Sequence, residues 1–353
     1  MDEFAREGLF YSYLLFKHVF RMMYWVWVPG LLVWGLLALK AHRPLCRWTL
    51  EAQGSLRAVV AALGMGATHS PRRSTSLATV AELWAAGVAP ATVMAYVIAT
   101  HTMVVYYIAF LTLLLGIEFA AGQVMGALFM TALMAVTCRY VIPSELWEAA
   151  RQQGRPASNP PPGNPSGPAV AAHHHAPGLT APIGRGWGEF VRLLGREVRF
   201  FLGPLIVGIL LGGFILAGGL EPWWVEGASL LGGGWAADVL NTLVAPFLAA
   251  LMWLGPVANL PVASNLFKSS ALTYPGLVVF LLASVIHPRN IIFYRKTFGL
   301  KLSWYLVGAF FCSAALSGLL VAGLFDLFGF RPGPVPLFRE LVDMIIMWVP
   351  GAM

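Results

Sequence analysis

Two long apolar stretches of this chain, residues 56–87 and 240–273, are interrupted by glycine, proline and polar residues. Each contains an apolar run too short to cross a bilayer, a small-residue break, predicted at Gly66-Ala67 and at Gly255-Pro256, and a second short helical run. Within a bilayer, a backbone that leaves the helix must be satisfied by protein or by a watery cavity. Paired interruptions of this kind point to the binding site of a transporter. The pattern therefore predicts a membrane protein that holds a solute between its two breaks.

The composition of the chain agrees with a membrane location. Hydrophobic residues make up 58% of the sequence and charged residues 11%, whereas soluble domains carry about 25% charged residues. The formal net charge of +7 does not indicate nucleic acid as a partner, because the basic residues are spread over the loops between apolar spans, as the positive-inside rule describes. We expect an integral membrane protein whose surroundings are the lipid bilayer.

Motifs for catalysis and for metal binding are missing from the sequence. Cys46, Cys138 and Cys312 are isolated, so neither a disulfide framework nor a cysteine-based metal site is expected. The run His173–His175 lies in a linker rich in proline and glycine, where such a run is more often inert than metal-binding. The zinc-protease, hydrolase and P-loop patterns are also missing. The sequence thus predicts no enzyme, no cofactor and no metal, and any active transport would be secondary or driven by a partner.

The lengths of the apolar runs predict how the chain is organised. A membrane helix needs about 20 apolar residues, which gives full spans at 22–39, 91–115, 119–142, 199–219, 274–292 and 303–326. The expected regions are an interfacial amphipathic N-terminus (1–21), a first transmembrane repeat (22–142), a Pro/Gly/His-rich linker with an amphipathic lead-in (143–198), a second repeat (199–330) and an interfacial C-terminal helix (331–353).

The distribution of charge predicts the topology of the two repeats. Basic residues follow the first span, surround the linker and separate the last two spans, whereas the stretch 221–238 carries only acidic charge. Placing the basic groups in the cytoplasm makes each broken segment a re-entrant hairpin. The predicted fold is all-α, with two inverted repeats of three transmembrane helices and one hairpin each. If the broken segments cross fully instead, the protein has eight transmembrane segments and parallel repeats.

A weak internal repeat supports this division. In both halves a proline-containing turn, at Pro90 or Pro275, leads into a long apolar helix. That helix reaches an Ala-Thr or Ala-Ser pair followed by a histidine: Ala99-Thr100-His101 in the first half, and Ala283-Ser284 with His287 in the second.

The blocks 255–299 (GPVANLPVASNLFKSSALTYPGLVVF…) and 66–100 (GATHSPRRSTSLATVAELWAAG…) carry a family resemblance. They resemble the two signatures of the predicted permease family that includes the organoarsenical efflux permease ArsP. This resemblance implies a polytopic inner-membrane permease. Arsenical-handling members have cysteines in the first signature, where a soft thiolate suits a soft metalloid. Residues 66–87 contain none, so the fold carries over and the arsenical substrate does not.

The first break supplies a polar set that suits an anion. Arg binds planar oxyanions in a bidentate manner, and Ser76 is expected to cap a helix 77–86 whose N-terminus would add a partial positive charge. Alternatively, the two arginines reach lipid headgroups. The candidate substrate-binding residues here are Thr68, His69, Arg72, Arg73, Ser74 and Thr75.

The second break supplies neutral polar residues, of which Asn259, Ser264 and Asn265 are the candidates for solute binding. Asn259 precedes Leu260-Pro261 and is expected to cap a restarting helix. Capping alone would explain its presence equally well.

Two further residues, Glu82 and His101, are candidates for proton coupling. Ionisable residues inside a membrane are functional candidates by default, and histidine suits a proton relay. Glu82 could instead pair with Arg72 or Arg73, and His101 could be a satisfied core residue. His287 is expected near the cytoplasmic face.

These observations predict a secondary permease or exporter in the cell inner membrane. Its cargo would be a small solute, an anion or a metalloid species, and its protein partner a second copy or another membrane subunit. Two alternatives remain at this point: a non-catalytic structural subunit of a membrane complex, and an intramembrane enzyme or lipid carrier with a cavity open to lipid.

Overall fold

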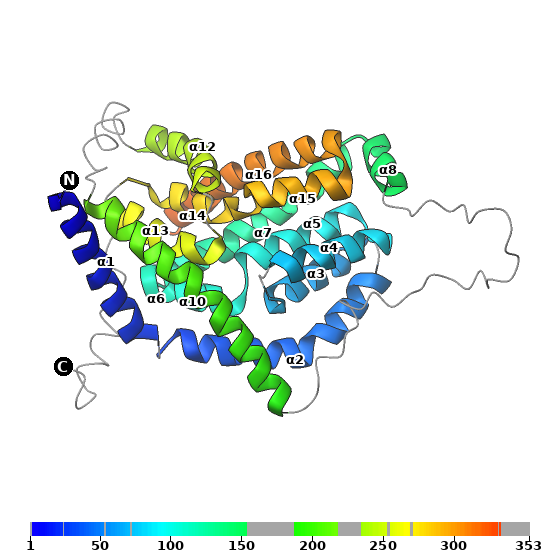
Figure 1. The fold of residues 1–353 in the computed structure, drawn as a ribbon. Coiled ribbons are helices and arrows are strands. Elements are labelled where there is room, and N and C mark those ends of the chain that lie inside the picture. The colour runs from blue at the N-terminus through cyan, green and yellow to red at the C-terminus, as the bar shows by residue number, and fades with distance from the viewer. Residues whose placement is uncertain are drawn as a thin grey trace, which may run out of the picture.

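The computed structural model describes residues 2–23, 25–52, 54–70, 73–153, 187–217, 234–252, 255–268, 271–330 and 332. Residues 154–186 of the predicted linker region (143–198) and nearly all of the predicted C-terminal helix (331–353) therefore lie outside the described residues. Every regular element in the described part is a helix. Figure 1 shows these helices gathered around α5, α7 and α14 at the centre of the molecule.

The described part of the first half contains eight helices. They are α1 (Asp2–Met23), α2 (Trp27–Glu51), α3 (Leu56–Thr68), α4 (Arg73–Ala85), α5 (Pro90–Thr102), α6 (Val105–Leu115), α7 (Ile117–Tyr140) and α8 (Ser144–Gln153). The described part of the second half contains α10 (Trp187–Ala217), α12 (Trp235–Leu251), α13 (Pro256–Lys268), α14 (Tyr274–Leu282), the 3₁₀ turn η1 (Ala283–Ile286), α15 (Pro288–Phe298) and α16 (Leu300–Leu327).

By length and composition, three described helices can cross a membrane, namely α7, α10 over Phe190–Ile215, and α16. Two helix pairs pass the same test together, α5 with α6 and α14–η1 with α15, which gives up to five spans. Each pair is bent by 44° at its break. The predicted full spans 91–115 and 274–292 correspond to these two bent pairs, in which the helix is interrupted at Met103 and at His287.

The predicted span 22–39 corresponds to α2, whose apolar part, Trp27–Ala41, is shorter than a full span. A helix boundary lies inside the predicted range, since α1 ends at Met23 and α2 begins at Trp27. The predicted interfacial segment 1–21 forms α1, which packs along α10 at one edge of the molecule (Figure 1). Its position relative to a bilayer stays a prediction.

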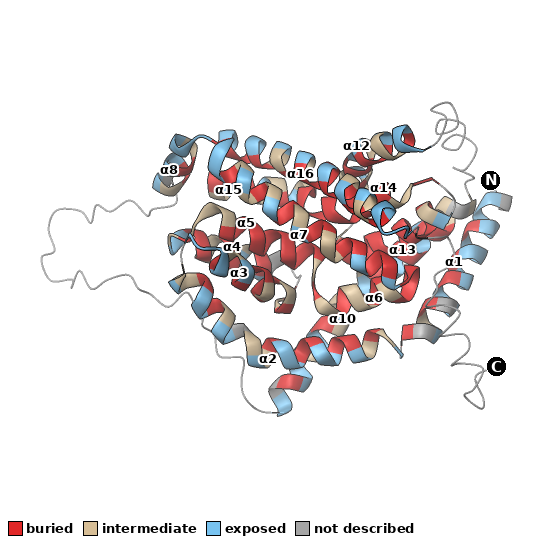
Figure 2. Ribbon diagram, turned by 180° about the vertical axis from the view of Figure 1, so that it is seen from behind, coloured by how far each residue is buried: buried red, intermediate tan, exposed pale blue. Residues whose placement is uncertain are grey.

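Burial separates a central layer from an outer one, as Figure 2 shows. The side chains of α13 and α14 are almost all buried, as are those from Thr92 to Thr102 of α5. The outer helices expose large apolar side chains, as is expected of surfaces that face lipid. Examples are Leu32 and Leu36 of α2, Val207 of α10, and Leu316 and Leu320 of α16.

The first interruption lies after Thr68 and not at Gly66-Ala67, which corrects the prediction. Gly66 is inside α3, where a Cβ would lie 2.6 Å from the Ala99 Cβ and 2.9 Å from the Tyr96 carbonyl oxygen. The glycine therefore serves the close contact between α3 and α5. The second interruption is where the sequence predicts it, since α12 ends at Leu251 and α13 begins at Pro256.

The two arms of each broken segment pack on other helices. In the first segment, α3 packs on α2 and α5, and α4 packs on α5. In the second, α12 packs on α14 and α16, whereas α13 packs on α10 and α14. The two halves of the chain meet through α1 with α10, through α7 with α16 and α14, and through α5 with η1.

Glycines of α10 allow helices to approach from two sides. A Cβ on Gly208 would lie 2.4 Å from the Ala258 carbonyl oxygen of α13, and one on Gly212 would lie 2.4 Å from the Asn265 Nδ2. Gly213 makes the equivalent approach to Ser12 of α1. Small residues at such contacts are typical of membrane helix packing, and they position α13 beside α10.

Candidate functional site

Helix α13 carries the predicted solute-binding residues of the second break deep inside the protein. Asn259 is 1% exposed, Ser264 is 0% exposed and Asn265 is 2% exposed. Four side-chain atoms of these residues have no hydrogen-bond partner among the described residues: the Asn259 Nδ2 and Oδ1, the Ser264 Oγ and the Asn265 Nδ2. Buried polar groups are normally paired, and leaving one unpaired costs about 1–3 kcal/mol. Helix α13 therefore holds unused hydrogen-bonding capacity that a solute or water can use.

Asn259 lies within α13 and does not cap a restarting helix, contrary to the prediction. The helix already begins at Pro256, which suits a first turn, and the Asn259 N–H donates to the Gly255 carbonyl oxygen at 3.1 Å. Pro261 is accommodated inside the helix. With capping excluded, the side chain of Asn259 has no bond within the described part of the chain that explains its burial.

At the first break, Thr68 and His69 at the end of α3 are bonded to the protein, whereas the Oγ of Ser76 on α4 is buried and has no hydrogen-bond partner among the described residues. The Thr68 hydroxyl donates to the Gly64 and Met65 carbonyl oxygens at 3.0 and 3.1 Å. The His69 Nδ1 and the Tyr96 hydroxyl are 2.5 Å apart and share a hydrogen bond. The Thr68 bonds stay within α3, and the bond between His69 and Tyr96 joins the end of α3 to α5, so this side of the break is braced.

The remaining residues of the predicted anion site are only partly described. Arg72 lies outside the described residues, and so do the side chains of Arg73 and Ser74. Thr75 is exposed, and its carbonyl oxygen accepts from the Thr79 hydroxyl at 3.0 Å.

Ser76 does not cap α4, which corrects the prediction, because α4 begins at Arg73 and places Ser76 inside the helix. Gly87 follows α4 with a φ of +81°, a left-handed conformation that favours glycine after a helix.

Glu82 lies close to the brace of the first break. The Tyr96 hydroxyl interacts with the Thr79 side chain and is within electrostatic range of Glu82 and of Cys46 from α2. Side chains from α2, α4 and α5 thus meet around one fully buried tyrosine.

His101 lies where the two bent spans meet. It is 3% exposed, and its Nε2 is 3.0 Å from the Nδ2 of Asn290 on α15. The Ser284 hydroxyl of η1 donates to the His101 carbonyl oxygen at 3.3 Å. The two repeat motifs identified in the sequence are therefore in direct contact at the bends.

Each bend is satisfied by polar groups near it. The Asn290 Nδ2 lies 3.3 Å from the Ser284 carbonyl oxygen and 3.2 Å from that of Val285, and the Tyr294 hydroxyl donates to Val285 at 3.1 Å. The end of a helix leaves carbonyl groups without backbone partners, and inside a membrane these must bond to protein or water. This arrangement explains how two bent spans are tolerated at the core.

His287 is 2% exposed, and its Nδ1 accepts from the Arg289 N–H at 3.1 Å, which caps α15. Its location near the cytoplasmic face stays a prediction. Sequence reasoning also missed several other buried polar residues, among them Asn290, Gln123 and Glu197. Glu197 was assigned to the linker region, but α10 extends back to Trp187 and the carboxylate accepts from the Tyr106 hydroxyl at 3.1 Å.

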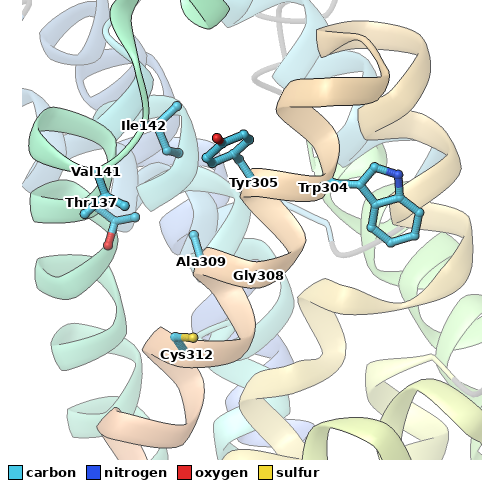
Figure 3. A pocket seen from close by; sticks show the side chains of 8 residues that line it. All are labelled: Thr137, Val141, Ile142, Trp304, Tyr305, Gly308, Ala309 and Cys312. Atoms are coloured by element: carbon cyan, nitrogen blue, oxygen red, sulfur yellow. The ribbon is translucent and has the colours of Figure 1, made fainter.

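A groove between α7 and α16 is a separate feature, with a volume of about 580 Å³. Figure 3 shows its lining, which comes from the end of α7, the residues just after it and the first half of α16. The lining residues are Thr137, Val141, Ile142, Trp304, Tyr305, Gly308, Ala309 and Cys312. None of the predicted site residues is among them.

The described helices define an all-helical, multi-pass membrane protein. The model of the predicted permease family matches residues 12–323, and the chain belongs to this family. The chain is also similar to "Putative permease Rv2963" of Mycobacterium tuberculosis (strain ATCC 25618 / H37Rv), with 26% identity over 289 residues, which cover 78% of this chain and 68% of the relative. No solved structure matches the chain. The resemblance seen in the sequence is confirmed, and the protein is a membrane permease.

Proposed function

We propose that the protein is a secondary permease that moves a small solute through a site between its two broken helical segments. The observation that carries this proposal is the set of unpaired polar atoms on α13, on Asn259, Ser264 and Asn265. Polar groups buried at membrane depth without partners are costly. A solute that forms the missing hydrogen bonds would remove this cost and would be bound selectively. Broken helices provide such binding groups in transporters.

The cargo we propose is an anion or a metalloid species. Arg72 and Arg73 follow the first break in the sequence, and arginine suits planar oxyanions. The neutral amides of α13 would add hydrogen bonds of either sense. Because the first signature lacks cysteine, a solute with oxygen atoms fits better than a soft thiol-seeking one.

The mechanism we propose uses two inverted repeats, each with a re-entrant hairpin, in the cell inner membrane. The equal bends of 44° in α5–α6 and in α14–α15 support a repeat, since equivalent spans of an internal repeat should share their irregularities. Glu82 and His101 would carry coupled protons. A second copy of the chain or another membrane subunit is its proposed protein partner.

Flux into sealed liposomes tests this function. Purified protein is reconstituted, and uptake of a panel of oxyanions and metalloid oxyacids is compared with that of protein-free liposomes. One solute should enter at least ten times faster with the protein, and Asn259→Ala should remove most of that difference. Thr137→Val, which changes the outer groove, serves as the matched control and should leave flux unchanged.

The anion preference has its own variant, Arg72→Ala combined with Arg73→Ala. It should abolish flux of an anion while the protein stays folded. Full anion transport by this double variant would remove the anion site from the proposal. Absence of flux for every solute, in a folded protein, would favour a structural membrane subunit instead.

A further inference from the structure

We infer that Asn290 is a positioning residue that holds His101 as the neutral Nδ1–H tautomer, with its Nε2 lone pair as the point of proton uptake. The inference rests on the proposed function only where it links this proton to solute transport. The tautomer itself follows from the hydrogen bonds on both sides of the imidazole ring.

The Nδ1 side of His101 must carry a hydrogen. The Nδ1 lies 2.8 Å from the Val97 carbonyl oxygen, one helical turn earlier. A carbonyl oxygen can only accept, so a bare Nδ1 at this distance would set two lone pairs against each other. The Thr100 hydroxyl lies 3.1 Å from the same nitrogen and donates its hydrogen to the Val97 carbonyl oxygen at 3.0 Å. Its oxygen can therefore only accept from the ring N–H.

The Nε2 side of His101 must be bare. Its neighbour is the Asn290 Nδ2, 3.0 Å away, which is a donor. The orientation of the Asn290 amide is fixed independently, because the same Nδ2 lies 3.3 Å from the Ser284 carbonyl oxygen and 3.2 Å from that of Val285. Rotating the amide would place its oxygen against both carbonyls. Two separate contacts therefore assign the same tautomer.

Proton uptake at Nε2 would change the joint between the two halves. The proton adds to the Nε2 lone pair, and the new N–H faces the N–H of Asn290. The Asn290 Oδ1 has no partner among the described residues, so a rotated amide could accept from the imidazolium. That rotation withdraws the Nδ2 from the Ser284 and Val285 carbonyl oxygens, which lie where α14–η1 meets α15. Protonation of His101 on α5 would thus weaken the hydrogen bonds that support the bend between α14–η1 and α15.

Charged and titratable groups occur on the elements packed against α5, which are α3, α4, α7, α14 and η1. They are Arg57 and, just after α3, His69; Arg73 and Glu82 of α4; Glu118, Cys138, Arg139 and Tyr140 of α7; Tyr274 of α14; and His287 directly after η1. Tyr96 and Glu82 belong to the cluster of the first break. The contacts of the imidazole ring itself with Val97, Thr100 and Asn290 are all to neutral groups.

Nitrogen-15 NMR of the full chain, labelled at histidine and reconstituted in lipid, reads the tautomer directly. The chain has eight histidines, so the His101 signals are assigned by their loss in His101→Gln. At pH 8 the parent should show a protonated Nδ1 and a bare Nε2. Asn290→Asp replaces the donor by a carboxylate acceptor and should give a ring protonated on both nitrogens. Ser284→Ala removes only the bond to the His101 carbonyl and should leave the ring unchanged.

A parent ring protonated at Nε2 would overturn the inference, and so would ring signals that are the same in the parent and in Asn290→Asp. Flux measurements then separate this inference from the proposed function. If the parent moves no solute, the permease mechanism fails while the NMR result for His101 stands. If the parent moves solute, Asn290→Asp should flatten the dependence of flux on pH, and Ser284→Ala should retain it.

Discussion

The two broken segments differ in how their polar groups are used. At the first break, Thr68 bonds to its own helix and His69 bonds to Tyr96 of α5. At the second break, Asn259 and Ser264 are deeply buried but their side chains have no partners within the described part of the chain. An unpaired buried polar group costs stability and a bonded one contributes to it, so the end of α3 acts as a brace at the first break, although the Ser76 Oγ of α4 is unpaired among the described residues. At the second break the unpaired atoms lie on Asn259, Ser264 and Asn265, and we propose this break as the binding surface.

The bends that follow the two breaks along the chain provide a useful contrast, because there both halves are alike. Each long span bends by 44°, and each bend follows a small residue, a hydroxyl residue and a histidine of the repeat motif. The two bends are in direct contact, since the Ser284 hydroxyl donates to the His101 carbonyl oxygen and the Asn290 Nδ2 lies 3.0 Å from the His101 Nε2. The two halves are therefore alike at the joint and differ at the two breaks, which are the parts we propose to contact the solute.

The largest loss of stability should come from a variant that moves α13, the helix of the second break, away from α10. A Cβ at Gly208 would lie 2.4 Å from the Ala258 carbonyl oxygen and 2.9 Å from its Cα, and both atoms are backbone. Gly208→Ala should therefore lower the free energy of unfolding by about 1–3 kcal/mol. Thermal unfolding in detergent measures this loss.

A matched control lies on the same helix. A Cβ added to Gly203 would meet open space, with no neighbouring atom of another described element within 4 Å, so Gly203→Ala should raise helix stability by about 0.5–1 kcal/mol. Equal stabilities for the two variants would show that the close contact between α10 and α13 does not position the second break.

A smaller effect is expected at the brace of the first break. Tyr96→Phe removes the hydroxyl that bonds to His69, and the loss of one such hydrogen bond should cost about 0.5–1.5 kcal/mol. Chemical unfolding of the parent and variant in the same detergent gives this difference. A variant as stable as the parent would mean that the first break is not braced, and the contrast between the two breaks would disappear.

The smallest effect should come from Ser284→Ala. Its hydrogen bond to the His101 carbonyl oxygen is 3.3 Å long and is one of several that satisfy the bends. We expect a loss of at most about 1 kcal/mol in the free energy of unfolding. A larger loss than that of Tyr96→Phe would place the main support of the fold at the joint of the halves and not at the first break.

Much of the architecture could be predicted from the sequence, because hydrophobic length and proline turns act locally. The pairs of short helices at 56–85 and 235–268, the glycine that follows α4 and the proline starts of α5 and α13–α14 are of this kind. The repeat motif in the sequence also singles out His101 and Ser284, which are in contact in the structure.

The misplaced features have non-local causes. Gly66 looked like a break because glycine weakens a helix, but its role is set by Ala99 on another helix. Ser76 and Asn259 have the chemistry of caps, yet both lie inside helices that begin earlier. Asn290 bonds to a histidine 189 positions away in the sequence, and no local pattern predicts such a partner. Whether a polar residue is braced or unpaired is likewise decided by tertiary packing.

Stability and flux of Asn259→Leu, measured on one reconstituted preparation, test the central claim most directly. Leucine has a similar size and removes two polar atoms that have no partner among the described residues, so the melting temperature should be unchanged or higher. Flux of the transported solute should fall at least tenfold, because those atoms are the proposed contacts of the solute. Unchanged flux, or a lower melting temperature with flux lost only in proportion to the unfolded protein, would contradict the account.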